Sequence, residues 1–254
     1  MTDINSKIIA HRGASFDAPE NTLPAIQLAW KQKIKRVEID VHLTKDNRIV
    51  AIHDANTSKI SVKNYSIKEE NLDTLQSIDI GSWKDLKWAN TTIASLEEIL
   101  NILPKDGILV IEIKSDICIV PVLAKALKYV PHNQLELISF HYETLAAIKS
   151  QLPLSKALWL LDLDYTSVTK SEILPLTKYI SKATSANFDG LNLWAGAIAD
   201  KNYIQEIKKH QLLVYIWTIN EPQKALRFLQ YGADAITTDR PLWMQQQLAK
   251  LTNE

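Results

Sequence analysis

The amino-acid sequence predicts an α/β fold, a TIM (β/α)8 barrel in which eight parallel strands alternate with helices. Short apolar runs rich in β-branched residues recur along the chain, and amphipathic segments separate them, as in repeated βαβ units. Eight such runs fit into 254 residues, which is the usual length of this barrel. An open doubly wound sheet is the alternative, but its glycine-rich GxGxxG turn is missing after the first run.

The predicted strands are the short apolar runs. They cover residues 7–11, 36–41, 108–113, 135–140, 156–161, 190–194, 212–218 and 235–238. The predicted helices are the segments whose apolar residues recur every three or four positions. They cover residues 22–32, 96–103, 120–129, 142–151, 201–210 and 222–230. The first helix has a clear start, because Asn21 or Thr22 can cap it and Pro24 suits its first turn.

One interval departs from the alternation of strands and helices. Residues 54–92 are polar and contain no helical segment of the expected kind. Just before them, the turn at residues 44–47 precedes the run RIVAIHD, which predicts an extra hairpin arm. We therefore expect a single domain over residues 1–254, with residues 54–92 as a small capping insertion after the second strand.

The composition excludes several classes of partner. Lys plus Arg number 29, and Asp plus Glu number 29, so no net field draws in nucleic acid or an anionic membrane. Cys118 is the only cysteine, so no disulfide can form within the chain. Residues 1–10 lack a basic segment followed by an apolar core, and no run approaches the roughly 18 apolar residues of a membrane span. We expect a cytoplasmic protein without nucleic-acid binding or stable membrane anchoring, and the sequence does not determine its oligomeric state.

Acidic side chains gather where the predicted strands end, which is where TIM barrels place their active sites. Glu38 and Asp40 are two positions apart on one strand, so both project into the barrel. Glu112 and Lys114 share a face of the next barrel strand in the same way. Two ionised acids side by side in a low-dielectric interior require a shared proton or a cation. Three carboxylates would suit Mg²⁺ or Ca²⁺, whereas ion pairing of Glu112 with Lys114 is the alternative.

Two histidines are expected at the same end of the barrel. His11 follows the first apolar run, and His53 follows the hairpin arm. Histidine exchanges protons near neutral pH, so the pair can act as general acid and general base; a structural hydrogen-bonded role is the alternative. Arg12 suits a phosphate because its planar guanidinium donates two parallel hydrogen bonds, although a surface ion pair would also explain it.

A series of short motifs runs from the first predicted strand to the last. They are HRG (11–13), PENT (19–22), E-x-D (38 and 40), TKD (44–46), V-x-x-HD (50–54), EIK (112–114), SF (139 and 140), W-T-I-N (217–220) and TD-x-P (238–241). In this order the motifs resemble those of the glycerophosphodiester phosphodiesterase family. The resemblance covers essentially the whole chain, and HRG, PENT and E-x-D are highly specific as a set.

The resemblance implies a TIM barrel with a small insertion after the second strand. It also implies a metal-dependent enzyme, because the family uses a divalent cation to hydrolyse glycerophosphodiesters, which are deacylated phospholipids, to glycerol 3-phosphate and an alcohol. By position, the metal ligands would be Glu38, Asp40 and Glu112, and the acid and base pair would be His11 and His53. The substrate-binding residues would be Arg12 and Lys114 at the phosphate, Glu20 and Asn21 along the site, and Trp217 at the glycerol backbone.

Two features depart from the pattern of that family. The usual glycine before the acidic pair is replaced in QKIKRVEID, and the arginine- and threonine-rich segment after the HD pair is reduced to ANTSKIS. Neither change falls on a predicted catalytic residue. Both bear on the shape of the insertion and therefore on the recognised head group.

Three other functions stay open at this point. A related phospholipase D that acts on lysolipids or sphingomyelin would use similar residues, but the chain shows no secretion signal, disulfide cysteines or apolar docking segment. A non-catalytic barrel that binds a phosphate ligand would be expected to lack one of the histidines or acids. A Schiff-base aldolase would need Lys114 in an apolar pocket, and the neighbouring Glu112 argues against that. The sequence also leaves open which histidine is the acid, and whether water or the neighbouring glycerol hydroxyl attacks the phosphorus.

Overall fold

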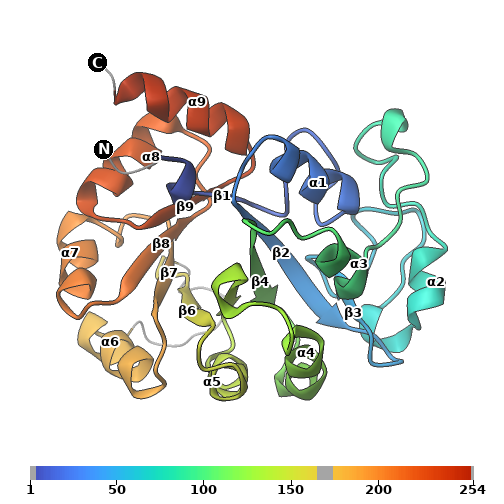
Figure 1. The fold of residues 1–254 in the computed structure, drawn as a ribbon, viewed down its shortest axis with the longest axis horizontal. Coiled ribbons are helices and arrows are strands. Elements are labelled where there is room, and N and C mark those ends of the chain that lie inside the picture. The colour runs from blue at the N-terminus through green and yellow to red at the C-terminus, as the bar shows by residue number, and fades with distance from the viewer. Residues whose placement is uncertain (1–3, 165–173, 253–254) are drawn as a thin grey trace.

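The computed structural model describes residues 4–164 and 174–252, and within these ranges eight parallel strands close into a barrel (Figure 1). The ring runs β1-β9-β8-β7-β6-β5-β4-β2, and pairing of β1 with β2 closes it. The strands are β1 (Ile8–Ala10), β2 (Arg36–Leu43), β4 (Ile108–Ile113), β5 (Leu135–Ser139), β6 (Lys156–Leu161), β7 (Gly190–Trp194), β8 (Leu213–Trp217) and β9 (Ala235–Thr238). The predicted TIM barrel is confirmed, and every predicted strand is present with small differences at its ends. The predicted domain range 1–254 also takes in residues outside the described ranges.

A further short strand lies outside the ring. β3 (Ile49–Ala51) pairs antiparallel with the carboxyl end of β2, as the predicted hairpin arm requires. The chain then returns to the barrel mouth, because the backbone N–H of Ile52 donates to the carbonyl of Asp40 at 3.0 Å. This contact delivers His53, the next residue, to the end of β2.

Helices surround the barrel (Figure 1). They are α1 (Leu23–Lys31), α3 (Leu96–Asn101), α4 (Val120–Leu127), α5 (Tyr142–Gln151), α6 (Leu176–Ser185), α7 (Lys201–Lys209), α8 (Pro222–Tyr231) and α9 (Pro241–Leu251). All six predicted helices are present, whereas α6 and α9 were not predicted. The sequence of α6 is rich in Thr, Ser, Ile and Tyr, which are weak helix formers. Burial of Tyr179, Ile180 and Ala183 along one face stabilises it instead.

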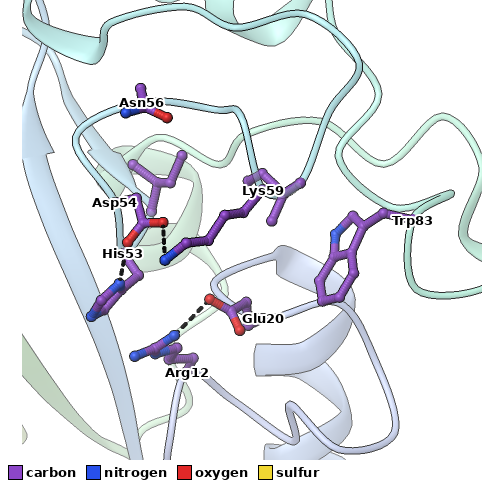
Figure 2. Close-up of a pocket in the computed structure, with 9 residues that line it drawn as sticks. Arg12, Glu20, His53, Asp54, Asn56, Lys59 and Trp83 are labelled. Atoms are coloured by element: carbon purple, nitrogen blue, oxygen red, sulfur yellow. Dashed lines mark hydrogen bonds and ion pairs between the residues drawn. The ribbon is translucent and has the colours of Figure 1, made fainter.

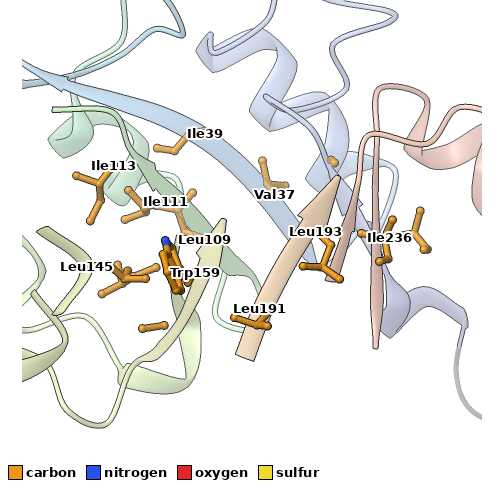
Figure 3. Close-up of a cluster of buried hydrophobic side chains, with 14 of the residues drawn as sticks. Val37, Ile39, Leu109, Ile111, Ile113, Leu145, Trp159, Leu191, Leu193 and Ile236 are labelled. Atoms are coloured by element: carbon orange, nitrogen blue, oxygen red, sulfur yellow. The ribbon is translucent and has the colours of Figure 1, made fainter. Parts of the chain in front are cut away.

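Residues alternate between the two faces of the barrel wall. On β2, Val37, Ile39 and Val41 belong to the main hydrophobic core beneath the helices. Figure 3 shows the first two of them. The intervening Glu38 and Asp40 therefore face the barrel interior, as predicted. A separate apolar cluster fills the interior below the mouth. It consists of Ile9, Val110, Ile138, Leu158, Leu160, Tyr215 and Ala235.

The segment between β3 and α3 has a small hydrophobic core of its own. It contains the 3₁₀ turns η2 (Ile67–Glu69) and η3 (Leu86–Trp88) and the short helix α2 (Leu72–Gln76). The buried residues of this core are Val50, Ile52, Ile67, Leu72, Leu75, Ile78, Ile80 and Ile93. The first two of these belong to the arm that carries His53. The segment also contacts the barrel through Lys84, whose Nζ donates to the carbonyl of Ser15 at 2.6 Å. Its role as a cap stays a prediction.

The remaining elements are short turns. They are η1 (Ile4–Lys7), η4 (Ile117–Ile119) and η5 (His132–Gln134). Among the described helices, none combines the length and the apolar character that crossing a membrane requires.

Candidate active site

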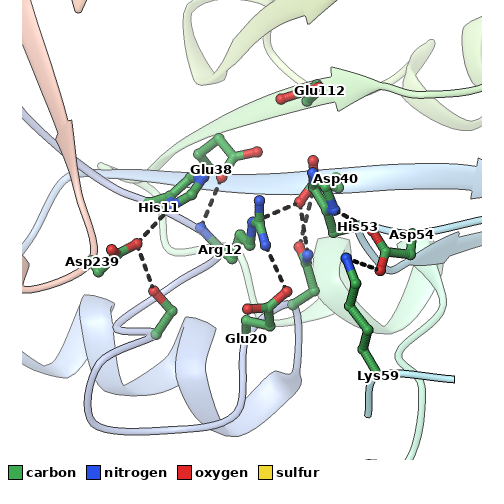
Figure 4. Close-up of polar contacts among 12 residues, drawn as sticks. His11, Arg12, Glu20, Glu38, Asp40, His53, Asp54, Lys59, Glu112 and Asp239 are labelled. Atoms are coloured by element: carbon green, nitrogen blue, oxygen red, sulfur yellow. Dashed lines mark hydrogen bonds and ion pairs between the residues drawn. The ribbon is translucent and has the colours of Figure 1, made fainter. Parts of the chain in front are cut away.

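The predicted site residues meet at the carboxyl ends of the barrel strands, and Figure 4 shows most of them. His11 and Arg12 follow β1, Glu38 and Asp40 lie on β2, His53 follows β3, Glu112 and Lys114 lie at the end of β4, Trp217 ends β8, and Glu20 and Asn21 precede α1. Parallel strands bring these sequence-distant positions to one end of the barrel. None of the predicted site residues lies elsewhere in the fold.

The three predicted metal ligands form a buried acidic cluster. Glu38, Asp40 and Glu112 are 2%, 1% and 9% exposed, and each offers an oxygen such that these atoms lie within 4.8 Å of one another. Burial and the charges of Asp40 and Glu112 raise the pKa of Glu38 well above its usual value. Glu38 Oε1 and Asp40 Oδ1 are buried and have no hydrogen-bond partner. An oxygen-rich cluster with unpartnered acceptors fits a hard divalent cation such as Mg²⁺ or Ca²⁺.

Asp40 is the carboxylate that the surrounding residues hold most firmly. Asn21 donates from Nδ2 to Asp40 Oδ2 at 2.8 Å and accepts from the Asp40 backbone N–H at 2.9 Å. Burial by itself would raise the pKa of Asp40, but the positive charges of Arg12 and Lys114 outweigh it and lower that pKa below its usual value. Asp40 is therefore ionised, whereas the pKa of Glu38 is raised.

The turn after β1 places Arg12 in contact with three acids. Arg12 adopts a left-handed backbone conformation with φ of 54°, and its backbone N–H donates to Glu38 Oε2 at 2.8 Å. Its guanidinium donates from Nη1 to Glu20 Oε1 at 2.7 Å, and its Nε lies 3.1 Å from Asp40 Oδ2. The turn thus orients a cation toward the acidic cluster, where an anionic substrate group could also reach it.

Lys114 supplies a second positive charge on the opposite side of Asp40. Its Nζ donates to Glu112 Oε1 at 2.8 Å and lies 3.5 Å from Asp40 Oδ1. Burial by itself would lower the pKa of Lys114, but Glu112 and Asp40 outweigh it and raise that pKa. The predicted ion pair of Glu112 with Lys114 is present, and Asp40 also lies near Arg12 and Lys114, whereas the pKa of Glu38 stays raised.

Each histidine has a carboxylate at Nδ1. His11 Nδ1 donates to Asp239 Oδ1 at 2.6 Å, and His53 Nδ1 donates to Asp54 Oδ1 at 2.7 Å. A carboxylate at Nδ1 fixes the ring and leaves Nε2 to exchange a proton. Lys59, from the insertion, contacts the other oxygen of Asp54 at 2.7 Å. Burial lowers the pKa of His53, so the neutral ring is favoured there.

Asp239 and Asp54 are functional candidates that the site prediction missed. Asp239 follows β9 within the TD-x-P motif, and its Oδ2 accepts from Asn220 Nδ2 at 2.6 Å. Burial by itself would raise the pKa of Asp239, but hydrogen bonds and charge, chiefly from His11, lower it to about 2. Strand-end acids in the two motifs TD-x-P and HD were the available signal. The pairing of Asp239 with His11 depends on the closed ring, whereas Asp54 directly follows its partner His53 in the sequence.

Two differently lined regions flank the acidic cluster. Toward the insertion lies a cavity of about 420 Å³, lined by Arg12, Glu20, Ile52, His53, Asp54, Asn56, Lys59, Ile60 and Trp83 (Figure 2). Toward the other side, Trp217 packs edge to face on Phe140 and Trp194, with ring centroids 5.5 and 5.0 Å apart. The site therefore has a polar chamber at one side and an aromatic wall at the other.

A closed parallel barrel with buried acids and paired histidines at its mouth defines a TIM-barrel protein with an enzyme-like site. The chain belongs to the glycerophosphoryl diester phosphodiesterase family, which matches residues 11–242. It is 29% identical over 240 residues to the glycerophosphodiester phosphodiesterase of Caldanaerobacter subterraneus subsp. tengcongensis, covering 92% of this chain and 94% of that protein. It is 26% identical over 244 residues to the glycerophosphodiester phosphodiesterase of Bacillus altitudinis, covering 93% and 95%.

A solved structure agrees with both the fold and the family. A phosphodiesterase of Oleispira antarctica, in complex with the product sn-glycerol-3-phosphate, superposes with a TM-score of 0.86 at 28% identity. The alignment covers 96% of each chain. The resemblance inferred from the motifs is confirmed at the level of the family.

Proposed function

We propose that this protein hydrolyses glycerophosphodiesters to glycerol 3-phosphate and an alcohol, with the help of a divalent cation. The observation that carries the proposal is a pair of histidines, each oriented by a carboxylate, beside a buried cluster of three acids. Family membership and the product complex of the Oleispira antarctica relative support it. The proposed substrate is a small molecule, and the even charge balance supports neither nucleic-acid binding nor stable membrane anchoring.

The proposed metal ligands are Glu38, Asp40 and Glu112. Their oxygens lie close together, and the acceptor atoms that lack a hydrogen-bond partner within the chain fit a cation such as Mg²⁺ or Ca²⁺. A bound divalent cation would neutralise a phosphate oxygen and offset the repulsion among these acids. The raised pKa values of Glu38 and Glu112 agree with this role, because burial and the neighbouring carboxylates disfavour their ionised forms.

The proposed roles of the other residues follow from their positions. Arg12 and Lys114 bind the phosphate oxygens and offset their negative charge, which otherwise repels a nucleophile. His11 and His53 each carry out one of the two proton transfers, through Nε2. One donates a proton to the oxygen of the leaving alcohol, and the other accepts a proton from the attacking hydroxyl. Attack by the neighbouring glycerol hydroxyl would release a cyclic phosphate first, whereas attack by water would not, and phosphorus NMR of the reaction separates the two routes.

The remaining predicted residues are proposed to hold the two halves of the substrate. Glu20 and Asn21 line the site, and Trp217 offers an apolar face to the glycerol carbons. The chamber beside the insertion would receive the alcohol that leaves. We infer that residues 54–92 act as a cap on one domain spanning 1–254, and that the protein works in the cytoplasm.

Other functions fit the site less well. A Schiff-base aldolase needs a neutral lysine, and the acids around Lys114 raise its pKa. A non-catalytic phosphate-binding barrel needs no paired histidines, and both pairs are present. A lysophospholipase D or sphingomyelinase D activity would use the same acids, and the substrate comparison below tests it directly.

The test is activity of the metal-stripped protein after separate addition of Mg²⁺, Ca²⁺ or Mn²⁺. The substrates are glycerophosphocholine, glycerophosphoethanolamine, lysophosphatidylcholine and bis(p-nitrophenyl) phosphate. The proposal expects no turnover without metal, and restored release of glycerol 3-phosphate from the first two substrates. Full activity in the presence of EDTA would refute the metal site, and preference for the lysolipid would replace the proposed substrate.

A further inference from the structure

A buried side chain on the far wall of the barrel has an unused hydrogen-bonding atom. Asn192 lies on β7 between Leu191 and Leu193, which pack outward into the main core, so Asn192 faces the barrel interior. It is 1% exposed, and its Oδ1 has no hydrogen-bond partner. Burying an amide oxygen without a hydrogen-bond donor costs free energy. A bound ligand that supplies the donor would remove this cost.

The barrel geometry places Asn192 across from the acidic cluster. In the closed ring, β7 and β2 are separated by three strands in either direction, so they stand on opposite walls. When the register of paired residues is followed from Asn192 through β6, β5 and β4 to β2, the level reached is that of His42. When it is followed through β8, β9 and β1 to β2, the level reached is that of Ile34. Glu38 lies midway between them, so Asn192 and Glu38 belong to the same interior layer.

The aromatic wall lies directly above Asn192. Trp194 and Trp217 are register partners at the ends of β7 and β8. Trp217 Nε1 donates to the backbone carbonyl oxygen of Asn192 at 3.3 Å. A ligand that reached Asn192 would therefore pass between the acidic cluster and the aromatic rings of Trp194 and Trp217. That combination suits a short carbon chain that carries a phosphate at one end and hydroxyl groups beyond it.

We propose that Asn192 is a further substrate-binding residue, which accepts a hydrogen bond from a glycerol hydroxyl at the floor of the site. The inference rests on the proposed function and specifies which half of the diester lies deep in the barrel. A hydroxyl supplies the donor that Oδ1 lacks, and the amide is uncharged, so it does not repel the phosphate as a carboxylate would. Asn192 thereby favours diesters whose retained half is glycerol over diesters without hydroxyls.

The test compares substrates with and without hydroxyl groups. Asn192→Leu keeps the size of the side chain and removes the acceptor. We expect its kcat/KM on glycerophosphocholine to fall by roughly 10- to 100-fold, while its rate on bis(p-nitrophenyl) phosphate stays within about twofold of the native rate. Leu160→Met, in the register partner on β6, is the matched control and should leave both rates unchanged.

Two results would overturn the inference. Equal losses on both substrates, with more metal needed for half-maximal activity, would assign Asn192 to the metal site or to folding. Native rates on both substrates would leave it without a role in binding.

A binding measurement separates this inference from the proposed function. By calorimetry, the native protein should bind sn-glycerol 3-phosphate at least about 10-fold more tightly than propyl phosphate, and Asn192→Leu should lose that preference. This result would uphold the inference even if glycerophosphocholine proved not to be the substrate. Equal affinities in the native protein would refute it even if glycerophosphocholine is cleaved.

Discussion

Asp239 Oδ1 lies 2.6 Å from Nδ1 of His11, a residue 228 positions earlier in the chain. The contact joins the first and last strands of the barrel, β1 and β9, which pair in parallel. Ser15 Oγ also donates to this carboxylate oxygen, at 3.3 Å. The orientation of one candidate catalytic histidine therefore depends on closure of the ring.

Replacing Asp239 with asparagine should lower kcat/KM on glycerophosphocholine by at least roughly 10-fold. The amide cannot stabilise the protonated imidazole of His11, and it permits the wrong tautomer. Steady-state kinetics for Asp239→Asn and the native enzyme provide the measurement. Exposed Asp106→Asn, remote from the site, is the control, and a native rate for Asp239→Asn would show that His11 needs no carboxylate.

Asp239 should also affect how the thermal stability of the protein depends on pH in acid. Its pKa is about 2 in the folded protein, below the usual unfolded value of about 3.9. Asp239 therefore contributes stability above about pH 4, and this contribution is lost as pH falls from there toward 2. Between pH 5 and pH 3, Asp239→Asn should lose less Tm than the native protein, as followed by circular dichroism. Parallel curves for the two proteins would contradict the lowered pKa.

The two histidines should respond differently to the leaving group. Each of His11→Ala and His53→Ala should lose at least roughly 10²-fold in kcat/KM on glycerophosphocholine. An activated p-nitrophenyl leaving group needs no proton, so the variant that lacks the general acid should recover selectively on bis(p-nitrophenyl) phosphate. Comparing both variants on both substrates assigns the roles. Near-native rates of both on glycerophosphocholine would return these histidines to a structural role.

Neutralising Glu38 should stabilise the metal-free protein while abolishing its activity. Because the folded pKa of Glu38 is raised, the metal-free protein loses stability as pH rises from the unfolded pKa through the folded one. Glu38→Gln removes this loss, so its Tm at pH 8 should exceed that of the metal-free native protein by about 2–4 °C, the shift that about 1 kcal/mol produces. Added Mg²⁺ or Ca²⁺ should raise the Tm of the native protein only. A lower Tm for the variant at pH 8 would contradict the proposed repulsion.

The insertion should influence the choice of alcohol more than the chemistry. Shortening the loop at residues 63–69 would test this, but that loop contains Ile67, which is buried in the core of the insertion. Trp83→Ala is the sharper test, because Trp83 is 45% exposed and lines the chamber. It should change the ratio of rates on glycerophosphocholine and glycerophosphoethanolamine several-fold and spare bis(p-nitrophenyl) phosphate.

The matched control for this test is Leu86→Ala, an exposed residue of the insertion that does not line the chamber. Its substrate ratio should equal that of the native enzyme. Equal loss on all substrates by Trp83→Ala would mean that the insertion completes the catalytic site.

Local periodicity was sufficient to predict the fold and the acidic cluster. The alternation of apolar residues around Glu38 and Asp40 determines which face of β2 is inside, and parallel strands then bring Glu112 beside them. The pairing of His11 with Asp239 was not predictable in this way, because it depends on which strands are neighbours when the ring closes. The alternation of Leu191 and Leu193 around Asn192 also indicates an inward side chain, but a single polar residue on an apolar strand did not suggest a role in the site.

The helices likewise include some that the local sequence predicts and some that it does not. The first predicted helix begins as expected, with Thr22 Oγ1 accepting from the backbone N–H of Ala25 and Pro24 in the first turn. Helix α6 was missed because its stability comes from the face that Tyr179 and Ile180 bury, and its own composition favours other conformations. Tertiary packing, which the local sequence does not show, decides such elements.

Because one arm lies outside the barrel ring, the two histidines of the site come from separate parts of the fold. His53 follows β3, and Val50 and Ile52 of this arm belong to the hydrophobic core of the insertion, whereas His11 follows β1 of the barrel itself. A protein engineer could therefore redesign the chamber surface at Asn56, Lys59 or Trp83 and keep the apolar residues beneath them. The insertion would then serve as an exchangeable part that changes the accepted alcohol and keeps its half of the histidine pair in place.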